Sequence, residues 1–172
     1  VAGEIYVHNN GALTSLSGLE ALSSLQGYLS VENNSSLTSL SGLDGLTSVG
    51  GALDINDNPA LTGLSGLSGL TVVGGRLGVF NSALTSLSGL ERLSSVDGDV
   101  TLYNNASLTS LSGLEGLVSV GKGLNILHNE ALTSLSGLES LSTVGGDVEI
   151  NDNDNLCEDE VEAIIAQLIS YS

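Results

Sequence analysis

The chain is poor in several residue types, and each scarcity excludes a class of structure or binding site. Its 172 residues include one cysteine, one proline and one phenylalanine, with no tryptophan and no methionine. A single cysteine, Cys157, excludes an internal disulfide and any metal cage built from several thiolates of one chain. No apolar run reaches the roughly 18 residues that a membrane-spanning helix needs. We therefore expect no membrane insertion.

Basic residues are equally scarce. Only Arg76, Arg92 and Lys122 oppose 20 acidic residues, which gives a formal net charge of −17. Nucleic acids and anionic lipid surfaces would repel such a chain, so we expect no nucleic-acid partner. Strong acidity, together with few lysines and many Asn, Ser, Thr and Gly residues, favours a secreted or cell-surface protein.

The chain has repetition in abundance. The motif LTSLSGL recurs at residues 13–19, 37–43, 84–90, 108–114 and 132–138, with LTGLSGL at 61–67. A fixed period of about 24 residues predicts a solenoid with one coil per repeat unit. Successive units are spaced by 24, 24, 24, 23, 24 and 24 residues and begin at Gly3, Gly27, Gly51, Gly75, Gly98, Lys122 and Gly146.

Within each unit the hydrophobic period changes. Leu53 and Ile55 alternate with polar neighbours, which predicts a half-buried strand and a parallel sheet across the coils. Hydrophobic residues then recur at every third position, which predicts an extended segment followed by 3₁₀-like turns. Paired glycines such as Gly74 and Gly75 precede the strands, and we expect them to adopt positive φ at corners.

Two further features concern the interior and the C-terminal end. Asparagines that share one register after the strand predict a buried ladder, in which each amide bonds the turns of neighbouring coils. From Cys157 the repeat gives way to a segment with a helical period. We expect Cys157 to be buried there, and the alternative is that it pairs with a segment outside this sequence. We therefore predict a solenoid over residues 1–156 and, in the same domain, a capping helix over 157–172. The ladder comprises Asn10, Asn34, Asn58, Asn105, Asn129 and Asn153, and the apolar helical face comprises Val161, Ile164, Ile165 and Leu168.

The pattern resembles leucine-rich repeats, L-x-I-x-x-N followed by leucines at every third position, and in particular the internalin-like and receptor L-domain varieties. The resemblance covers about residues 1–156. It implies a parallel β-solenoid of about seven 24-residue coils, with one main strand and an extended or 3₁₀ back per coil, closed here by a C-terminal α-helix. It also implies binding through the strand face, without catalysis. Many family members carry an N-terminal cap that this chain lacks, so we expect the first strand edge to be exposed or to be covered by residues outside this sequence. An exposed edge would permit self-association.

Few residues of the chain could form a catalytic site. His8 and His128 are the only histidines, and stacked coils about 4.8 Å apart would separate them by more than about 20 Å. Metalloprotease, nucleophile-elbow and phosphate-loop motifs are absent. The Asp-rich turns at 56–60 and 151–160 do not follow the spacing of an EF-hand loop. We expect no enzymatic activity, no cofactor and no metal site.

The first candidate surface is the strand face, where outward positions vary between coils. Phe80, Tyr103 and Leu127 would stand side by side on adjacent coils as an exposed apolar stripe. An aromatic stripe with a polar rim predicts a contact site for a protein or glycan, in binding or adhesion. The alternative is cross-strand packing that only stabilises the sheet. The rim would comprise Arg76, Asp99, Thr101 and Asn125.

The second candidate surface is formed by the hydroxyls of the LTSLSGL motif. Bonds from these hydroxyls to neighbouring backbone in a tight coil would explain them structurally. Alternatively, a flat and evenly spaced ladder of hydroxyls and methyls predicts an ice-binding protein. The sequence leaves open whether these side chains face solvent or lie inside turns. One file comprises Thr14, Thr38, Thr62, Thr85, Thr109 and Thr133, the next Ser15, Ser39, Ser86, Ser110 and Ser134, and a third Ser17, Ser41, Ser65, Ser88, Ser112 and Ser136.

Overall fold

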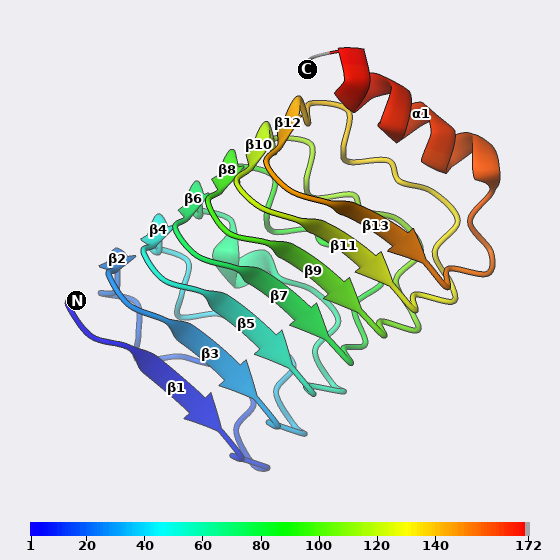
Figure 1. Cartoon of the computed structure of the whole chain (residues 1–172). Coiled ribbons are helices and arrows are strands. Elements are labelled where there is room, and N and C mark those ends of the chain that lie inside the picture. The colour runs from blue at the N-terminus through cyan, green and yellow to red at the C-terminus, as the bar shows by residue number, and fades with distance from the viewer. Residues whose placement is uncertain (171–172) are drawn as a thin grey trace.

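The computed structural model describes residues 1–170, which coil into a parallel β-solenoid closed at one end by a helix (Figure 1). The main strands form a seven-stranded sheet, called sheet A here, in the order β1-β3-β5-β7-β9-β11-β13. Each strand pairs in parallel with the strand one coil away, as the sequence predicts. The strands are β1 (Ile5–His8), β3 (Leu29–Glu32), β5 (Leu53–Asn56), β7 (Leu77–Phe80), β9 (Val100–Tyr103), β11 (Leu124–Leu127) and β13 (Val148–Asn151).

A second parallel sheet, called sheet B here, was not predicted. It has six strands of two residues each, which run just before the corners that lead into sheet A (Figure 1). Two residues are too short a run for a period of two to be recognised in sequence. The strands are β2 (Ser24–Leu25), β4 (Ser48–Val49), β6 (Val72–Val73), β8 (Ser95–Val96), β10 (Ser119–Val120) and β12 (Thr143–Val144).

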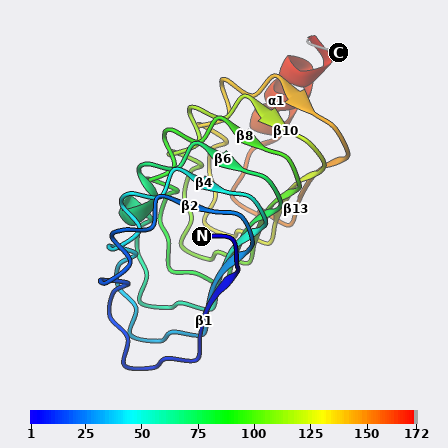
Figure 2. The same ribbon diagram turned by 90° about the vertical axis from the view of Figure 1, so that its left-hand side faces the viewer.

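The core runs the length of the solenoid between the sheets and the turns, and Figure 2 shows the coils stacked one behind another. Leu53 and Ile55 point inward from β5 and are buried, as their alternation predicts. The leucines at every third position, such as Leu61 and Leu64, are also fully buried. Each such side chain contributes about 1.5–3 kcal/mol of hydrophobic free energy. The predicted fold class is therefore confirmed.

The paired glycines have a different role from the expected one. None of them adopts positive φ; Gly74 instead lies so close to the preceding coil that a Cβ would overlap the carbonyl of Gly50. The expectation was wrong because close backbone approach also demands glycine. Positive φ occurs at Gly18, Gly42, Gly89, Gly113 and Gly137 in the turns, and at the residue after each main strand.

The buried asparagine ladder is confirmed from the second coil onward, whereas Asn10 in the first coil is exposed. Asn105 is fully buried, its backbone N–H donates to Asn129 Oδ1 (3.0 Å), and its amide donates to the Val79 carbonyl (3.0 Å). In the 23-residue fourth coil the ladder position is taken by Ser82, whose hydroxyl donates to Asn105 Oδ1 (2.7 Å). The ladder thus bonds the first three coils in series, from Asn10 to Asn58, and the last four in series, from Ser82 to Asn153.

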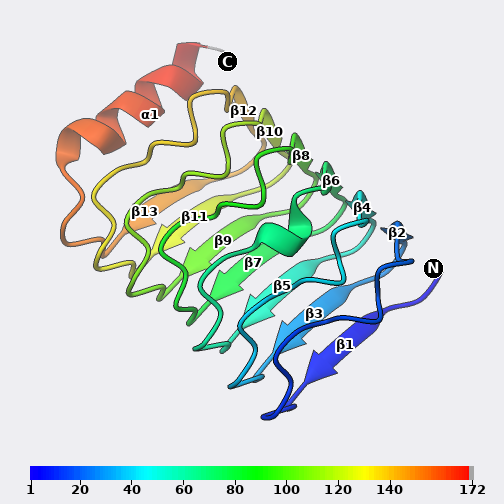
Figure 3. The ribbon, with the colours of Figure 1, turned by 180° about the vertical axis from the view of Figure 1, so that it is seen from behind.

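Carboxylates close the turns that follow LTSLSGL. Glu115 Oε2 accepts the backbone N–H of Gly113 (2.9 Å), and the same bond recurs in four other coils. The third coil has Ser68 at this position and forms η1 (Ser65–Leu67) instead (Figure 3). Among residues 1–170 this is the only full 3₁₀ helix. The other backs have the predicted 3₁₀-like turns, in which a backbone N–H donates to the carbonyl three residues earlier, as Leu114 does to Leu111 (3.1 Å). The other turn carboxylates are Glu20, Asp44, Glu91 and Glu139.

The helix α1 (Glu158–Ser170) covers the last coil (Figures 1 and 3). Glu160 Oε2 accepts the backbone N–H of Leu135 (2.8 Å). In an earlier coil the equivalent N–H, that of Leu87, donates to the carbonyl of Ser112 one coil further on (2.8 Å). The carboxylate of Glu160 therefore takes the place that a carbonyl of the following coil has elsewhere.

Other contacts of the cap differ in part from expectation. Ile164 is buried and Val161 and Leu168 are half-buried, but Ile165 is 45% exposed. Cys157 is also exposed, so its predicted burial was wrong: it precedes the helix instead of facing the core. The predicted capping segment 157–172 ends outside the described residues. Within residues 1–170 no helix has the length and apolar character to cross a bilayer.

Candidate ligand-binding face

The predicted stripe on sheet A is present. Phe80, Tyr103 and Leu127 are direct partners in the registers of β7, β9 and β11. Tyr103 is 39% exposed, whereas Phe80 and Leu127 are half-buried. The stripe therefore presents one prominent ring flanked by two side chains that lie lower on the sheet.

Phe80 lies low because its ring occupies space that Gly78 leaves empty. A Cβ at Gly78 would overlap both this ring and the Asp54 carboxylate. The Arg76 guanidinium carbon lies 5.2 Å from the ring centroid, a cation–π distance. The same guanidinium holds Asp54 through two bonds, Nε to Oδ1 (3.1 Å) and Nη2 to Oδ2 (2.9 Å). Cross-strand packing thus accounts for Phe80 and Arg76.

Tyr103 is held by rings on both sides. Its centroid lies 6.5 Å from that of Phe80 and 5.2 Å from that of His128, the latter in an edge-to-face arrangement with 75° between the planes. His128 Nε2 lies 3.4 Å from Asp152 Oδ2 on the next coil. We call Arg76, Phe80, Tyr103 and His128 the aromatic cluster.

His128 was not predicted to belong to this surface. It occupies the left-handed position after β11, with φ of 56°. At the six equivalent positions the residue is Asn or Asp, the types that adopt this conformation most readily. A comparison of the repeats at this position would have found His128 as the exception. The six equivalents are Asn9, Asn33, Asp57, Asn81, Asn104 and Asp152.

The predicted rim is brought together only in part. Thr101 and Asn125 are register partners on β9 and β11 and lie half-buried beside the stripe. Asp99 stands four residues before Tyr103, about 13 Å away along an extended strand. Its Oδ1 accepts the backbone N–H of Gly123 (3.0 Å). Asp99 therefore lies at the N-terminal ends of the strands, away from the stripe.

A second cluster on sheet A, the polar cluster, links the first three coils. His8 Nε2 lies 2.9 Å from Ser30 Oγ, and the Ser30 hydroxyl donates to Glu32 Oε1 (2.7 Å). Nucleophilic catalysis would need that hydroxyl to donate to the imidazole instead. The Asn56 amide also donates to Glu32 (3.2 Å). The polar cluster thus joins coils through side chains.

Tyr6 stands next to the polar cluster and is 56% exposed. Its ring packs edge-to-face on that of His8, with centroids 5.4 Å apart. Its hydroxyl donates to Glu4 Oε2 (2.8 Å), and this hydrogen bond raises the pKa of Tyr6 above its ordinary value.

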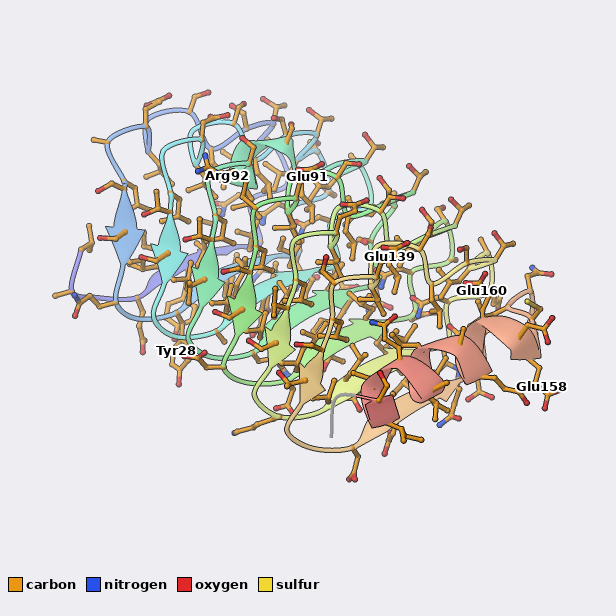
Figure 4. The ribbon with its side chains drawn as sticks, turned by 90° about the horizontal axis from the view of Figure 1, so that it is seen from above. Tyr28, Glu91, Arg92, Glu139, Glu158 and Glu160 are labelled. Carbon is orange, nitrogen blue, oxygen red and sulfur yellow. The ribbon has the colours of Figure 1, made fainter. Side chains whose placement is uncertain are left out.

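The structure also orients the hydroxyl files on the turn side, where Figure 4 shows Glu91 and Glu139 opposite Tyr28. All six threonines of the first file are exposed, and the serines of the second file are half-buried. The hydroxyl of Thr109 donates to the carbonyl of Thr85 one coil earlier (3.1 Å), and two other threonines repeat this bond. Ser110 and Ser112 bond each other (3.0 Å). Bonds within the protein therefore explain much of this regularity.

The sequence profile of the receptor L domain family matches residues 47–167, about two thirds of the chain. The chain belongs to the receptor L domain family. The matched range of this L domain contains the whole aromatic cluster, and the same coil continues through the residues before it. L domains are non-enzymatic, ligand-binding parts of the extracellular regions of receptors. Searches of curated proteins and of solved structures found no match to this L domain.

Proposed function

We propose that this L domain is a secreted or cell-surface module that binds a protein ligand through sheet A, around the aromatic cluster, in recognition or adhesion. The observation that carries the proposal is the exposed ring of Tyr103, fixed between Phe80 and His128. Rigid aromatic anchors in the centre of a patch supply most of the free energy of typical interfaces. Family membership supports a protein ligand over a glycan.

The residues would have different roles. Tyr103 and Leu127 would provide the apolar contact, and Thr101 and Asn125 would provide hydrogen bonds beside it. Arg76 would keep the Phe80 ring in place through its bonds to Asp54. The predicted rim residue Asp99 would meet only a ligand that spans the width of sheet A.

Selection of random displayed peptides on the immobilised protein tests the proposal without assuming a ligand. The double variant Tyr103→Ala, Leu127→Ala should lose at least ten-fold in affinity for the recovered peptides, because both anchors are removed. Thr109→Tyr, on the turn side, is the matched control and should retain them. Peptides that bind the double variant as well as the parent would contradict the proposal.

A second candidate function, ice binding, is supported by the exposure of all six threonines at regular coil spacing. Growth of single ice crystals in a nanolitre osmometer tests it directly. Faceted, arrested crystals that become round with Thr109→Tyr would support the threonine file as the site. Round crystals with the parent protein would leave these hydroxyls with their structural bonds alone.

Self-association through the first coil is a further proposal. Ile5, Val7, Leu13 and Leu19 are only partly buried, whereas their equivalents one coil on are fully buried or nearly so. A second copy on this end would remove their apolar surface from water. Sedimentation velocity over a hundred-fold dilution should then show a dimer that dissociates, and a constant monomer would refute the idea.

A further inference from the structure

Sheet A differs from the turn side in what its carboxylates do. The outward rows extend from one residue before to one residue after each main strand, and Arg76 is their only lysine or arginine. Its charge is already neutralised by Asp54. The carboxylates in these rows are Glu4, Glu32, Asp54, Asp57, Asp99, Asp147, Glu149 and Asp152.

On the turn side the acidic residues have partners. Glu20, Asp44, Glu91, Glu115 and Glu139 each accept a backbone N–H, as described above. The carboxylates in the last coil of sheet A differ from these, because Asp147, Glu149 and Asp152 are all exposed to solvent. Within residues 1–170, Asp147 and Glu149 make no side-chain hydrogen bond or ion pair. Their charge is therefore available to a ligand.

This acidic coil lies next to the aromatic cluster. Tyr103, Leu127 and Asn151 are successive register partners, so Tyr103 stands two coils, or about 10 Å, from β13. Side chains two residues apart in an extended peptide are about 7 Å apart. One basic side chain could therefore lie on the Tyr103 ring while a second, two residues on, reaches the carboxylates of Glu149 or Asp152.

We propose that the ligand of sheet A is a basic segment of a protein, with lysine or arginine side chains that contact Tyr103 and the carboxylates of the last coil. The proposal rests on the proposed function and specifies the chemistry of its partner. A cation over a tyrosine ring is attracted by the ring's quadrupole. The unpaired carboxylates of Asp147 and Glu149 favour a cationic partner and repel an acidic one.

The test uses three end-capped pentapeptides that are identical except at positions two and four. These positions carry lysine and arginine in the basic peptide, glutamine in the neutral one and glutamate in the acidic one. Amide chemical shifts of the full chain report where each peptide binds and how tightly. The basic peptide should give saturable shifts in β9, β11 and β13, about ten-fold tighter than the neutral peptide. Raising the salt from 50 to 300 mM should weaken it about three-fold.

Three variants locate the contacts. Tyr103→Ala should weaken the basic peptide about three- to ten-fold, and Glu149→Gln about two-fold. The matched control is Glu162→Gln, which removes the same charge from an exposed position of α1 and should change nothing.

The remaining outcomes each overturn the inference. Equal affinity of all three peptides for sheet A would refute the preference for cations and leave the proposed function intact. Shifts spread over the turn carboxylates and α1, or an equal effect of Glu162→Gln, would show that the basic peptide follows net charge alone. If none of the peptides shifts sheet A, the inference fails, and the displayed-peptide selection decides the proposed function separately.

Discussion

The turn side and sheet A of this solenoid contrast in how they use similar polar residues. On the turn side the letters hardly change between coils, and the polar groups bond within the molecule, as Thr109 does to Thr85 and Glu115 to Gly113. On sheet A the outward residue changes with every coil, from Glu32 through Phe80 to Leu127. In a solenoid, strict repetition thus indicates internal bonding, and variation indicates where specificity resides.

The largest expected effect comes from a turn glycine. Gly113 has φ of 111°, and a Cβ there would overlap the carbonyl of Leu87. Gly113→Ala should therefore lower the free energy of unfolding by about 3–5 kcal/mol in urea denaturation. Gly63 occupies the serine file, and a Cβ there would meet nothing. Gly63→Ala is the control and should stay within about 0.5 kcal/mol, and equal losses would contradict the strain argument.

The asparagine ladder lies between sheet A and the turns, and its removal should have the second largest effect on stability. Asn105→Ala leaves the buried backbone N–H of Ser82 without its partner and removes the bond to the Val79 carbonyl. It should cost about 2–4 kcal/mol of unfolding free energy. Asn105→Ser should cost less, because Ser82 already shows that a serine hydroxyl can serve this position. The prediction fails if both variants unfold at the urea concentration of the parent.

The third coil sharpens the comparison, since it is the turn without a carboxylate. Glu115→Ala should lower the free energy of unfolding by about 1 kcal/mol through loss of its bond to Gly113. Ser68→Glu should raise it by about 0.5 kcal/mol and replace the 3₁₀ turn by the geometry of the other coils. Chemical shifts of the Gly66 amide would report the change, and an unchanged turn would show that Ser68 is not its cause.

Substitution on sheet A should affect ligand affinity strongly and stability only weakly. Tyr103→Ala should lower the free energy of unfolding by less than about 1 kcal/mol, because the ring is partly exposed and its ring contacts are weak. Ligand affinity should nevertheless fall sharply. A loss of stability as large as that of Asn105→Ala would instead assign Tyr103 to the scaffold.

The smallest effect is a local dependence on pH. Backbone hydrogen bonds from Gly18 and Glu20 hold the pKa of the Glu20 carboxyl below its ordinary value of 4.5. Because this pKa is lowered by folding, the associated stability is present above about pH 4.5 and is lost as the pH falls through the folded value. The Gly18 amide shift should titrate with a midpoint below 4.5. Gly66, whose turn has no carboxylate, should not follow it.

Periodicity predicted the solenoid, the main strands, the ladder and the helix, because buried positions recur wherever the backbone repeats. It did not predict the roles of the glycines, since Gly74 is required by close approach and Gly113 by φ, and both read as the same letter. The register of Phe80, Tyr103 and Leu127 followed from repeat alignment. The bonding of Arg76 to Asp54 did not, because it depends on side-chain conformation above Gly78. Nor did the exposure of Cys157, which depends on how the chain enters α1.

The coils of this solenoid are stacked in a single row, and this arrangement determines how the described residues would respond to a pulling force. Each coil is bonded mainly to its two neighbours, through short strands and the asparagine ladder. Tension on β1 would load the bonds between the first two coils, whereas tension on α1 would first detach this helix, which Glu160 and Gln167 bond to Leu135 and Leu141. Such a stack peels in series, and every coil of 24 residues releases about 80 Å of chain. The protein would then lengthen in equal steps under load, as a tether does.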